Sequence, residues 1–391
     1  MSEKIRERIY ADNAATTPVS EKALAAMLPY FRERFGNPSA IYSYGQEAKK
    51  ALEHSRGAVA KAIGALNNEI YFTSGGTESD NWAIHSVGAL KSSKGKHIIS
   101  TAIEHNAVLR TLETMQAQGY EITLLNPDKN GQIAAEALER AIRHDTILIS
   151  IMTANNVVGT VLPIEALGAV ARRHNIIFHT DAVQAAGHIP VTVRALSVDL
   201  LSLSAHKFHG PKGVGALFSK IPLTLPPYIT GGGQEKGRRS GTENVPGIAG
   251  MAAALEEGAE NVPHTAPYLR ALRDKLMDRT LKIPGVYVTG DPVNRLPGHA
   301  SFVFEGIRHS AHVITLLNEA GICASSGSAC SASSTEAPHV LRAMGYDEEI
   351  ARSALRISLS QYNTEQDIDR INEELPRIIR EVRHKKDGPL G

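Results

Sequence analysis

A lysine and an aspartate, each placed where a predicted buried strand ends, have the surroundings that point most directly to chemistry. Lys207 follows the run DLLSLS (199–204), and Asp181 follows the run NIIFHT (175–180). A lysine amine reacts with carbonyl groups when it is partly desolvated or lies near other cations. A buried carboxylate is costly unless a cation meets it, and a protonated pyridine nitrogen would be such a cation. The two residues therefore indicate a pyridine-type cofactor, held by Lys207 as a Schiff base and kept charged as an electron sink by Asp181.

Both residues also have simpler interpretations. Asp181 could cap the helix that follows it. Lys212 competes with Lys207, but it lies in GPKGVG, which is typical of an exposed turn between strands. We favour Lys207, because it sits between a buried strand and a glycine-rich turn.

The segment YFTSGGTESDNWAI (71–84) predicts a phosphate-binding turn between a strand and a helix. Gly75 and Gly76 let backbone N–H groups approach an anion, Thr77 can add a hydroxyl, and the helix N-terminus carries partial positive charge. The spacing matches neither a Walker loop nor a dinucleotide-binding fingerprint. Taken alone, the segment fits an ordinary capped strand–helix turn equally well.

Three other segments carry candidate binding groups. His105 follows a predicted strand and could stack on a planar ring or move protons. Arg356 enters a predicted strand and could hold a carboxylate with two parallel hydrogen bonds. The segment GGGQEKGRRSGTENVPG (231–247) suits an anion-facing loop. The simpler interpretations are a structural histidine, a surface arginine and a solvated connector.

The chain has two cysteines, Cys323 and Cys330, so a disulfide framework is excluded and a reducing compartment is expected. Their spacing matches no zinc-ligand pattern, and we expect no metal site. Cys330 lies in GICASSGSACSASSTEAPHVLRAMG (321–345), whose small polar residues predict an exposed loop with a reactive thiol. Cys323 lies in an apolar context and is expected to pack internally.

The elements that must position these residues alternate between short apolar runs and amphipathic helical patterns, from about residue 60 to 220. This alternation predicts an α/β fold with a mostly parallel sheet. Helices are predicted at 134–144 and 163–175 from apolar residues spaced three and four apart. Buried strands are predicted at 69–73, 97–101, 121–125, 146–152, 175–180 and 199–204, and the pattern ends after GVGALFS (213–219).

The pattern changes after residue 220, and 391 residues suit two domains at roughly 100–200 residues each. A Pro- and Gly-rich passage precedes a long predicted helix at about 248–282. Apolar runs at 286–290 and 300–306, and helices at 311–321 and from about Thr364, indicate a smaller α+β domain. We predict a large domain at 21–260 and a small domain at 261–391 that carries the Cys330 loop, with residues 1–20 joining the small domain.

Composition places the chain among ordinary globular proteins, with 42% hydrophobic and 21% charged residues. Forty-two basic residues against forty-one acidic ones leave a formal charge of +1, which gives no general reason to bind nucleic acid or an anionic membrane. No apolar stretch approaches the ~20 residues of a membrane span. The opening MSEKIRERIYADN does not resemble a signal peptide, so we expect a cytoplasmic protein.

Several motifs, taken in order, resemble those of the cysteine desulfurases within the class V aminotransferase superfamily. The resemblance runs from about residue 8 to 375, and the SSGSAC wording is similar to the first group of the family, which serves iron–sulfur cluster assembly and related sulfur delivery. It implies a fold-type-I enzyme dependent on pyridoxal 5'-phosphate, with a mostly parallel seven-stranded sheet in its large domain, acting as a homodimer on L-cysteine. The motifs are YADNAATTP (10–18), GNPS (36–39), TSGGTESDN (73–81), EHNAVL (104–109), HTDAVQAAG (179–187), SLSAHKFHGPKGVG (202–215), RRSGTEN (238–244) and SSGSACS (325–331).

The resemblance also implies roles for individual residues. Lys207 would carry the cofactor and transfer protons, His105 would stack on the ring, Asp181 would pair with the ring nitrogen and Gln184 would contact the ring hydroxyl. Arg356 would hold the substrate carboxylate, and Asn156 would contact cofactor and substrate. Cys330 would attack the substrate sulfur, giving alanine and a persulfide for an acceptor such as an iron–sulfur scaffold or a transfer-RNA thiolation protein. The phosphate would be held by Gly76, Thr77, Ser204 and His206, with Thr242 reaching over from the partner subunit.

Three positions depart from the residues that are usual in the family's motifs. NNVVG (155–159) has Val157 where an acidic residue is usual, Ser360 replaces a glycine, and Tyr42 stands where histidine is common. A selenocysteine lyase or a class V aminotransferase would keep the cofactor residues without requiring the Cys330 loop. A sulfur-delivery scaffold with weak turnover is a third interpretation of the same motifs.

Overall fold

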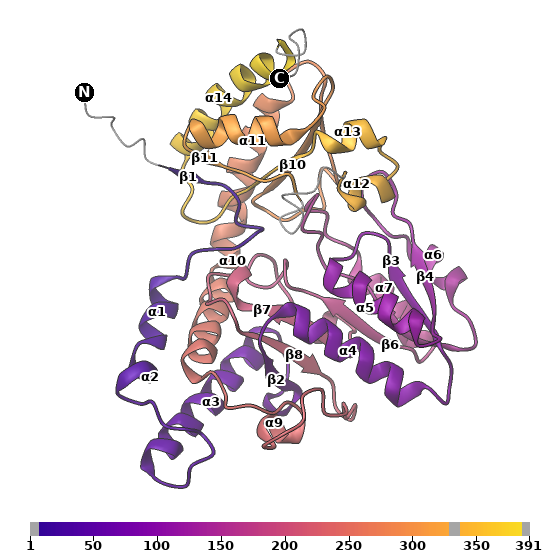
Figure 1. Ribbon diagram of the computed structural model, residues 1–391, viewed down its shortest axis with the longest axis vertical. Coiled ribbons are helices and arrows are strands. Elements are labelled where there is room, and N and C mark those ends of the chain that lie inside the picture. Colours follow the sequence, from indigo (N-terminus) through magenta and orange to yellow (C-terminus); the bar gives the residue numbers. More distant parts are fainter. Residues whose placement is uncertain (1–7, 328–336, 385–391) are drawn as a thin grey trace.

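A seven-stranded sheet forms the centre of the larger part of the molecule in the computed structural model, which describes residues 8–327 and 337–384 (Figure 1). Its strand order is β2-β8-β7-β6-β5-β3-β4. All neighbouring pairs are parallel except those that β8 makes with β2 and β7, so the predicted mostly parallel α/β sheet is confirmed. The strands are β2 (Ile70–Thr73), β3 (His97–Thr101), β4 (Glu121–Leu125), β5 (Thr146–Ser150), β6 (Ile177–Asp181), β7 (Leu200–Ser204) and β8 (Gly215–Ser219).

One strand is not buried as predicted. The run 121–125 forms β4, but four of its five side chains are half-buried or exposed, and Leu124 is 43% exposed. β4 lies at one edge of the sheet and pairs only with β3, whereas β2 at the other edge is largely buried. The apolar composition of a single run does not distinguish an edge strand from a central one.

Helices cover both faces of this sheet, as crossover connections between parallel strands require. Helices α4 (Gly76–Lys91) and α5 (Asn106–Ala117) lie on one face. The other face is covered by α3 (Ser43–Ala62), α7 (Ile164–Arg173) and the first half of α10 (Val245–Thr280). The shorter helices are α1 (Glu21–Met27), α2 (Pro29–Arg32), α6 (Ala135–Ala141), α8 (Val193–Leu196) and α9 (Gln234–Gly237), with single 3-10 turns at Asn67–Glu69 and Ala205–Lys207.

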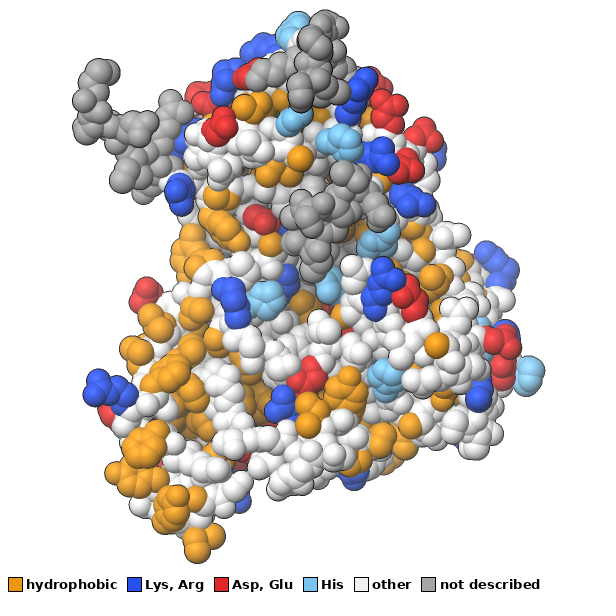
Figure 2. Space-filling model, in the orientation of Figure 1, with side chains coloured by type: hydrophobic (Ala, Val, Ile, Leu, Met, Phe, Trp, Pro, Cys, Tyr) orange, Lys and Arg blue, Asp and Glu red, His pale blue; other side chains and the backbone are white. Residues whose placement is uncertain are grey.

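The region from α1 to the start of α3 exposes a group of large apolar side chains. Figure 2 shows apolar side chains gathered at the lower left, where Figure 1 places these helices. We call this group the α1–α3 patch. Its members are Leu24, Leu28, Phe31, Phe35, Ile41, Tyr42 and Tyr44, from 42% to 91% exposed.

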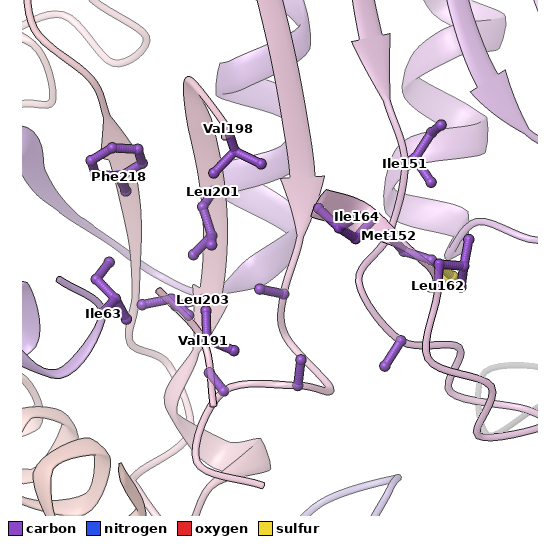
Figure 3. Close-up of a cluster of buried hydrophobic side chains, with 14 of the residues drawn as sticks. Ile63, Ile151, Met152, Leu162, Ile164, Val191, Val198, Leu201, Leu203 and Phe218 are labelled. Carbon is purple, nitrogen blue, oxygen red and sulfur yellow. The ribbon is translucent and has the colours of Figure 1, made fainter. Parts of the chain in front are cut away.

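The strand side chains alternate between two separate apolar clusters. Leu200 packs with Trp82 of α4 in one cluster, whereas Leu201 and Leu203 belong to the larger cluster on the opposite face. Figure 3 shows part of the larger cluster, where Leu201 and Leu203 of β7 lie near Ile63 and Phe218. This alternation fixes which side chains of β6 and β7 face α4, and the site depends on it.

A third hydrophobic cluster lies in the upper part of Figure 1, around a three-stranded antiparallel sheet of order β12-β10-β9. The short strands β1 and β11 pair in parallel beside it, so Ile9 joins this cluster. Helix α10 contributes Ile248 to the larger cluster of the central sheet and Leu272 to this one. The predicted division at residue 260 stays a prediction. The elements here are β1 (Ile9–Tyr10), β9 (Val286–Val288), β10 (His299–Phe304), β11 (Ile322–Cys323), β12 (Leu355–Ser358), α11 (Ser310–Glu319), α12 (His339–Ala343), α13 (Glu348–Arg352) and α14 (Glu365–His384).

Among the described residues, no helix is both long and apolar enough to cross a bilayer.

Candidate active site

A cavity of about 300 Å³ lies at the carboxyl ends of β6 and β7, between the central sheet and the upper part of the molecule. Ligands of open parallel sheets bind at this edge, because the loops that follow the strands converge there. The cavity brings together most of the residues predicted from sequence. Those that line it are Gly76, Thr77, His105, Asn156, Asp181, Gln184, Ser204, His206, Lys207 and Arg356.

Lys207 reaches the cavity from the single 3-10 turn that follows β7. Its Nζ donates hydrogen bonds to the carbonyl oxygens of Ala14 (2.8 Å) and Ala15 (2.7 Å). The N-terminal segment is tied to this turn by the bond from Thr17 N to His206 O (2.9 Å). Two backbone carbonyls thus hold the amine at the cavity wall, whereas Lys212 is exposed and does not line the cavity.

Asp181 is the last residue of β6 and is 6% exposed. Its Oδ1 accepts a hydrogen bond from Val183 N (2.8 Å). Burial raises the pKa of the carboxyl, and the neighbouring His105, the hydrogen bond from Val183 N and the charge of Lys207 oppose that rise. A buried carboxylate at the rim of a cavity is the acceptor that a protonated ring nitrogen needs.

His105 caps α5, so its structural and its chemical interpretation hold together. Its Nδ1 accepts a hydrogen bond from Ala107 N (3.1 Å), which leaves the proton of the neutral ring on Nε2. Burial, together with the charge of Lys207, lowers the pKa of His105, although Asp181 acts in the opposite direction. The cavity therefore contains a neutral imidazole with a fixed orientation.

The predicted phosphate-binding turn lies at the start of α4, a helix of 16 residues. Gly75 has φ 155°, and a Cβ added to Gly76 would lie 2.7 Å from Val183 Cγ2. Ser204 and His206 face the same cavity. Burial, with nearby lysines, lowers the pKa of His206 to about 4, so this ring is neutral and can donate or accept a hydrogen bond.

Arg356 lies on β12 and is 1% exposed, so its interpretation as a surface arginine is wrong. Its Nη2 donates to Asp12 Oδ1 (2.7 Å), and its Nη1 donates to Asn156 O (2.7 Å) and Gly327 O (3.2 Å). Its Nε is buried and has no partner among the described residues. The guanidinium therefore retains N–H capacity for an anionic ligand while three protein groups fix its plane.

Val157 forms an apolar part of the cavity wall and is 3% exposed. It packs against Gly327, where an added Cβ would lie 2.9 Å from Val157 Cγ1. The other two departures lie elsewhere, since Ser360 lines a separate small cavity and Tyr42 belongs to the α1–α3 patch. Of the three departures, Val157 alone touches this cavity.

Several residues of the cavity were missed in the sequence analysis. Asp80, Met152 and His339 line it, and so do Ala14 and Ala15. The segment DNAATTP (12–18) entered only as part of a family resemblance, because its contribution comes from backbone oxygens. One of those oxygens, Ala14 O, also accepts from Gln184 Nε2 (2.9 Å), which fixes the Gln184 amide.

Two predicted site residues are not placed in this cavity. Thr242 is exposed and does not line it. The loop before Thr242 is held by a buried pair of Arg56 with Glu235 (2.8 Å) and by Arg239 with Glu78 (2.9 Å). Cys330 lies outside the described residues.

Comparisons with known proteins agree with this geometry. The family model described as aminotransferase class-V matches residues 9–371. A cysteine desulfurase named IscS from Methanosarcina thermophila is 49% identical over 376 residues, covering 96% of this chain and 93% of that protein. One named NifS from Azotobacter vinelandii is 44% identical over 96% of this chain and 94% of that protein. The chain belongs to the cysteine desulfurases.

Solved structures agree. A NifS-like protein superposes with a TM-score of 0.90 at 40% identity, covering 95% of this chain and 99% of the other. A NifS-like protein from Rickettsia africae gives a TM-score of 0.86 at 32% identity, with the same coverage. The predicted fold type I and the dependence on pyridoxal 5'-phosphate are confirmed.

The cavity fits that cofactor on its own evidence. The start of α4, where a Cβ at Gly76 would collide with Val183, suits the phosphate, and buried Asp181 suits the ring nitrogen. Lys207 is the amine on the wall between them. Bound there, the cofactor supplies an electron sink for negative charge on the substrate Cα.

Proposed function

We propose that this cysteine desulfurase breaks the carbon–sulfur bond of L-cysteine, releases L-alanine and carries the sulfur on Cys330 as a persulfide for an acceptor protein. The observation that carries the proposal is the convergence of Lys207, Asp181 and Arg356 on one cavity. The reaction balances, because L-cysteine and a thiol give L-alanine and a persulfide. The substrate sulfur is oxidised as the new sulfur–sulfur bond forms, and the substrate carbon is reduced and gains a proton.

In this proposal each described residue has a separate task. The unpartnered Nε of Arg356 and its neighbouring Nη2 bind the substrate carboxylate, while Asn156 and Gly327 hold the far side of the guanidinium. Lys207 Nζ removes a proton from the substrate Cα and returns a proton during formation of alanine. Neutral His105 would pack against the cofactor ring, and the Asp181 carboxylate would keep the ring nitrogen protonated.

Cys330 as a thiolate attacks the substrate sulfur. The identity of this nucleophile separates the proposal from a selenocysteine lyase or a class V aminotransferase with the same cofactor residues. Cys330→Ala should lose turnover of L-cysteine while Lys207 still binds the cofactor. Retained L-cysteine turnover in Cys330→Ala would overturn the persulfide proposal, and an assay on L-selenocysteine identifies a lyase. Lys207→Ala should abolish the visible absorbance of the lysine-bound cofactor, which an inert scaffold would lack from the start.

We also propose a homodimer in which Thr242 completes the phosphate site of the partner subunit. Support comes from the exposed α1–α3 patch, since contiguous apolar surface of this kind marks protein interfaces. Support also comes from Thr242, which is exposed at the end of a loop braced by buried Arg56. A mixture of Lys207→Ala and Thr242→Ala chains tests this, because mixed dimers would contain one intact site. Activity should then appear that neither variant shows alone, and its absence would contradict a shared site.

The division of the chain and the cellular role complete the proposal. A large domain at 21–260 and a small domain at 261–391 are supported by the cluster around β9, β10 and β12, which includes no residue of 21–260, although Val340 of α12 and Ala351 of α13 pack in the larger cluster of the central sheet. The acceptor would be an iron–sulfur scaffold or a transfer-RNA thiolation protein in the cytoplasm, supported by the SSGSAC wording around Cys330 and by low cysteine content. Transfer of labelled sulfur from the persulfide to a purified acceptor tests the role directly.

A further inference from the structure

The side of the sheet that faces α4 changes from apolar to polar as it approaches the cavity. Leu148 of β5 and Leu200 of β7 pack in the apolar cluster beneath α4. Two residues further along the same strands and on the same face are Ser150 and Ser202, both buried. A buried polar layer therefore lies between the apolar cluster and the cavity.

His179 of β6 lies in the middle of this layer and is fully buried. Its Nδ1 is 2.8 Å from Ser150 Oγ, and its Nε2 is 2.9 Å from Ser202 Oγ. Both ring nitrogens thus have hydroxyl partners. One hydroxyl can accept from the protonated nitrogen of a neutral imidazole and the other can donate to the bare nitrogen. Burial lowers the pKa of His179 to about 3.

Asp80 enters the layer from α4 and is 1% exposed. Ser202 is its hydrogen-bonding neighbour. Its Oδ1 lies 3.6 Å from His179 Nε2, too far for a hydrogen bond, and has no hydrogen-bond partner among the described residues. Asp80 also lines the cavity, so this unpartnered oxygen lies at the wall of the cofactor site.

Two further carboxyl groups approach Asp80. Asp181 lies two residues beyond His179 on the same face of β6. Glu104 precedes α5, is fully buried, and accepts hydrogen bonds from Thr101 Oγ1 (2.6 Å) and Met152 N (3.0 Å). Three buried carboxyl groups close to one another repel when ionised, so they do not all carry a negative charge at the same time.

The surroundings decide which carboxyl holds the negative charge. Asp181 faces the positive charge of Lys207 and the imidazole of His105, and it accepts a hydrogen bond from Val183 N. Among the described residues, Asp80 has neutral His179 and the Ser202 hydroxyl as its polar neighbours, and the carboxyl groups of Asp181 and Glu104 lie on its other side. Burial, and then the charge of Asp181, raise the pKa of Asp80 well above its usual value; the hydrogen bond with Ser202 opposes the rise, and Glu104 adds to it when ionised.

We propose that Asp80 is a positioning residue that carries a proton in the working enzyme, so that the negative charge facing the cofactor ring resides on Asp181 alone. The consequence for the ring rests on the proposed cofactor site, whereas the protonation of Asp80 does not. The competing arrangement is an ion pair of ionised Asp80 with protonated His179. It contains the same number of protons, so only a measurement that detects the protonated carboxyl itself separates the two.

The first test compares Asp80→Asn with the wild type. The folding equilibrium constant of each cofactor-loaded protein is measured as a function of pH. A carboxyl whose folded pKa is raised stabilises the fold below its unfolded pKa, and that stabilisation disappears as pH rises towards the folded pKa. Asparagine removes this loss. Relative to wild type, the variant should therefore gain up to about tenfold in the folding equilibrium constant per pH unit above about pH 4.

Ionised Asp80 beside neutral His179 predicts a ratio of variant to wild type that does not rise with pH, because the wild-type carboxyl then releases no proton on unfolding above about pH 4. The ion pair with protonated His179 gives the same rising ratio as the proposal, because it holds the same number of protons, and the infrared measurement separates those two. A falling or constant ratio would overturn the proposal. Asp278→Asn is the matched control, because Asp278 is exposed on α10 and should show no such trend.

A second measurement uses the wild-type protein, so it does not depend on the variant folding. Infrared spectra of protein labelled with ¹³C-aspartate should contain the carbonyl band of a protonated aspartate at neutral pH, shifted by the label. That band should be absent from Asp80→Asn. Wild-type protein without the band, or a variant that retains it, would show that Asp80 is ionised.

The positioning role has its own readout, the pH at which the visible absorbance of the lysine-bound cofactor titrates. The neutral amide of Asp80→Asn should leave this pH unchanged, and Asp80→Leu should move it because Ser202 loses its polar neighbour. A shift in Asp80→Asn would mean that Asp80 contributes charge, which refutes the proposal. A wild-type protein without this absorbance would instead overturn the proposed function, and the stability and infrared results would still decide the state of Asp80.

Discussion

Replacing Arg356 with lysine should selectively weaken recognition of the substrate carboxylate. The guanidinium uses Nη1 and Nη2 for Asn156, Gly327 and Asp12, and its buried Nε remains for a ligand. A lysine has one nitrogen and cannot serve these groups and a bidentate carboxylate together. Loss of one charge-assisted hydrogen bond costs about 1.5–3 kcal/mol. We therefore expect kcat/KM for L-cysteine to fall about 10- to 150-fold.

The assay compares L-cysteine with its methyl ester, which lacks the carboxylate charge, and follows sulfide released in the presence of a reducing thiol. The penalty of Arg356→Lys should be large for L-cysteine and small for the ester. Arg377→Lys is a matched control, because Arg377 is 55% exposed on α14 and should affect neither substrate. Equal losses on both substrates would refute the reasoning, since the damage would then lie in the pocket and not in carboxylate recognition.

Three further predictions concern buried groups of the same region. Burial raises the pKa of Glu104 from 4.5 to about 8, so keeping this carboxyl protonated lowers the free energy of unfolding by about 3 kcal/mol at pH 7. In Glu104→Gln, the free energy of unfolding measured by denaturant titration should therefore fall less between about pH 4.5 and 8. An unchanged pH dependence would contradict this. Gly327→Ala should lower the free energy of unfolding by about 1–2 kcal/mol, because φ is +86° and the new Cβ would lie 2.9 Å from Val157 Cγ1. Adding Val157→Ala should recover part of this loss in thermal unfolding. No recovery would mean that the contact with Val157 is unimportant. Gly76→Ala should weaken cofactor affinity in equilibrium dialysis through its contact with Val183 Cγ2, and unaltered affinity would place the phosphate elsewhere.

The parts of the site that follow strand ends could be predicted from sequence. Asp181 and Lys207 come directly after apolar runs, and parallel strands bring their carboxyl ends to one edge of the sheet. The glycine turn before α4 has a local signal of the same kind, because a strand, two glycines and a helical pattern are visible in a short window. Local pattern and sheet geometry together were sufficient for these residues.

Other features depend on contacts between distant segments, which one sequence does not reveal. Arg356 is buried because Asp12, which lies 344 positions away, meets its guanidinium. Ala14 contributes a backbone oxygen, and any residue type has one. In the sequence Asp80 is an ordinary polar residue of a helix. Its burial depends on which face of α4 packs on the sheet. The edge position of β4 likewise depends on strand order.

The central claim is that sulfur leaves L-cysteine through Cys330, and mass spectrometry of the protein tests it most directly. The cofactor-loaded protein is exposed to L-cysteine without a reducing thiol, alkylated and digested. The account predicts one added sulfur atom on the peptide that contains Cys330, together with an equal amount of L-alanine, and neither product in Lys207→Ala. L-alanine formed without added sulfur on Cys330, or added sulfur found on Cys323 instead, would contradict it.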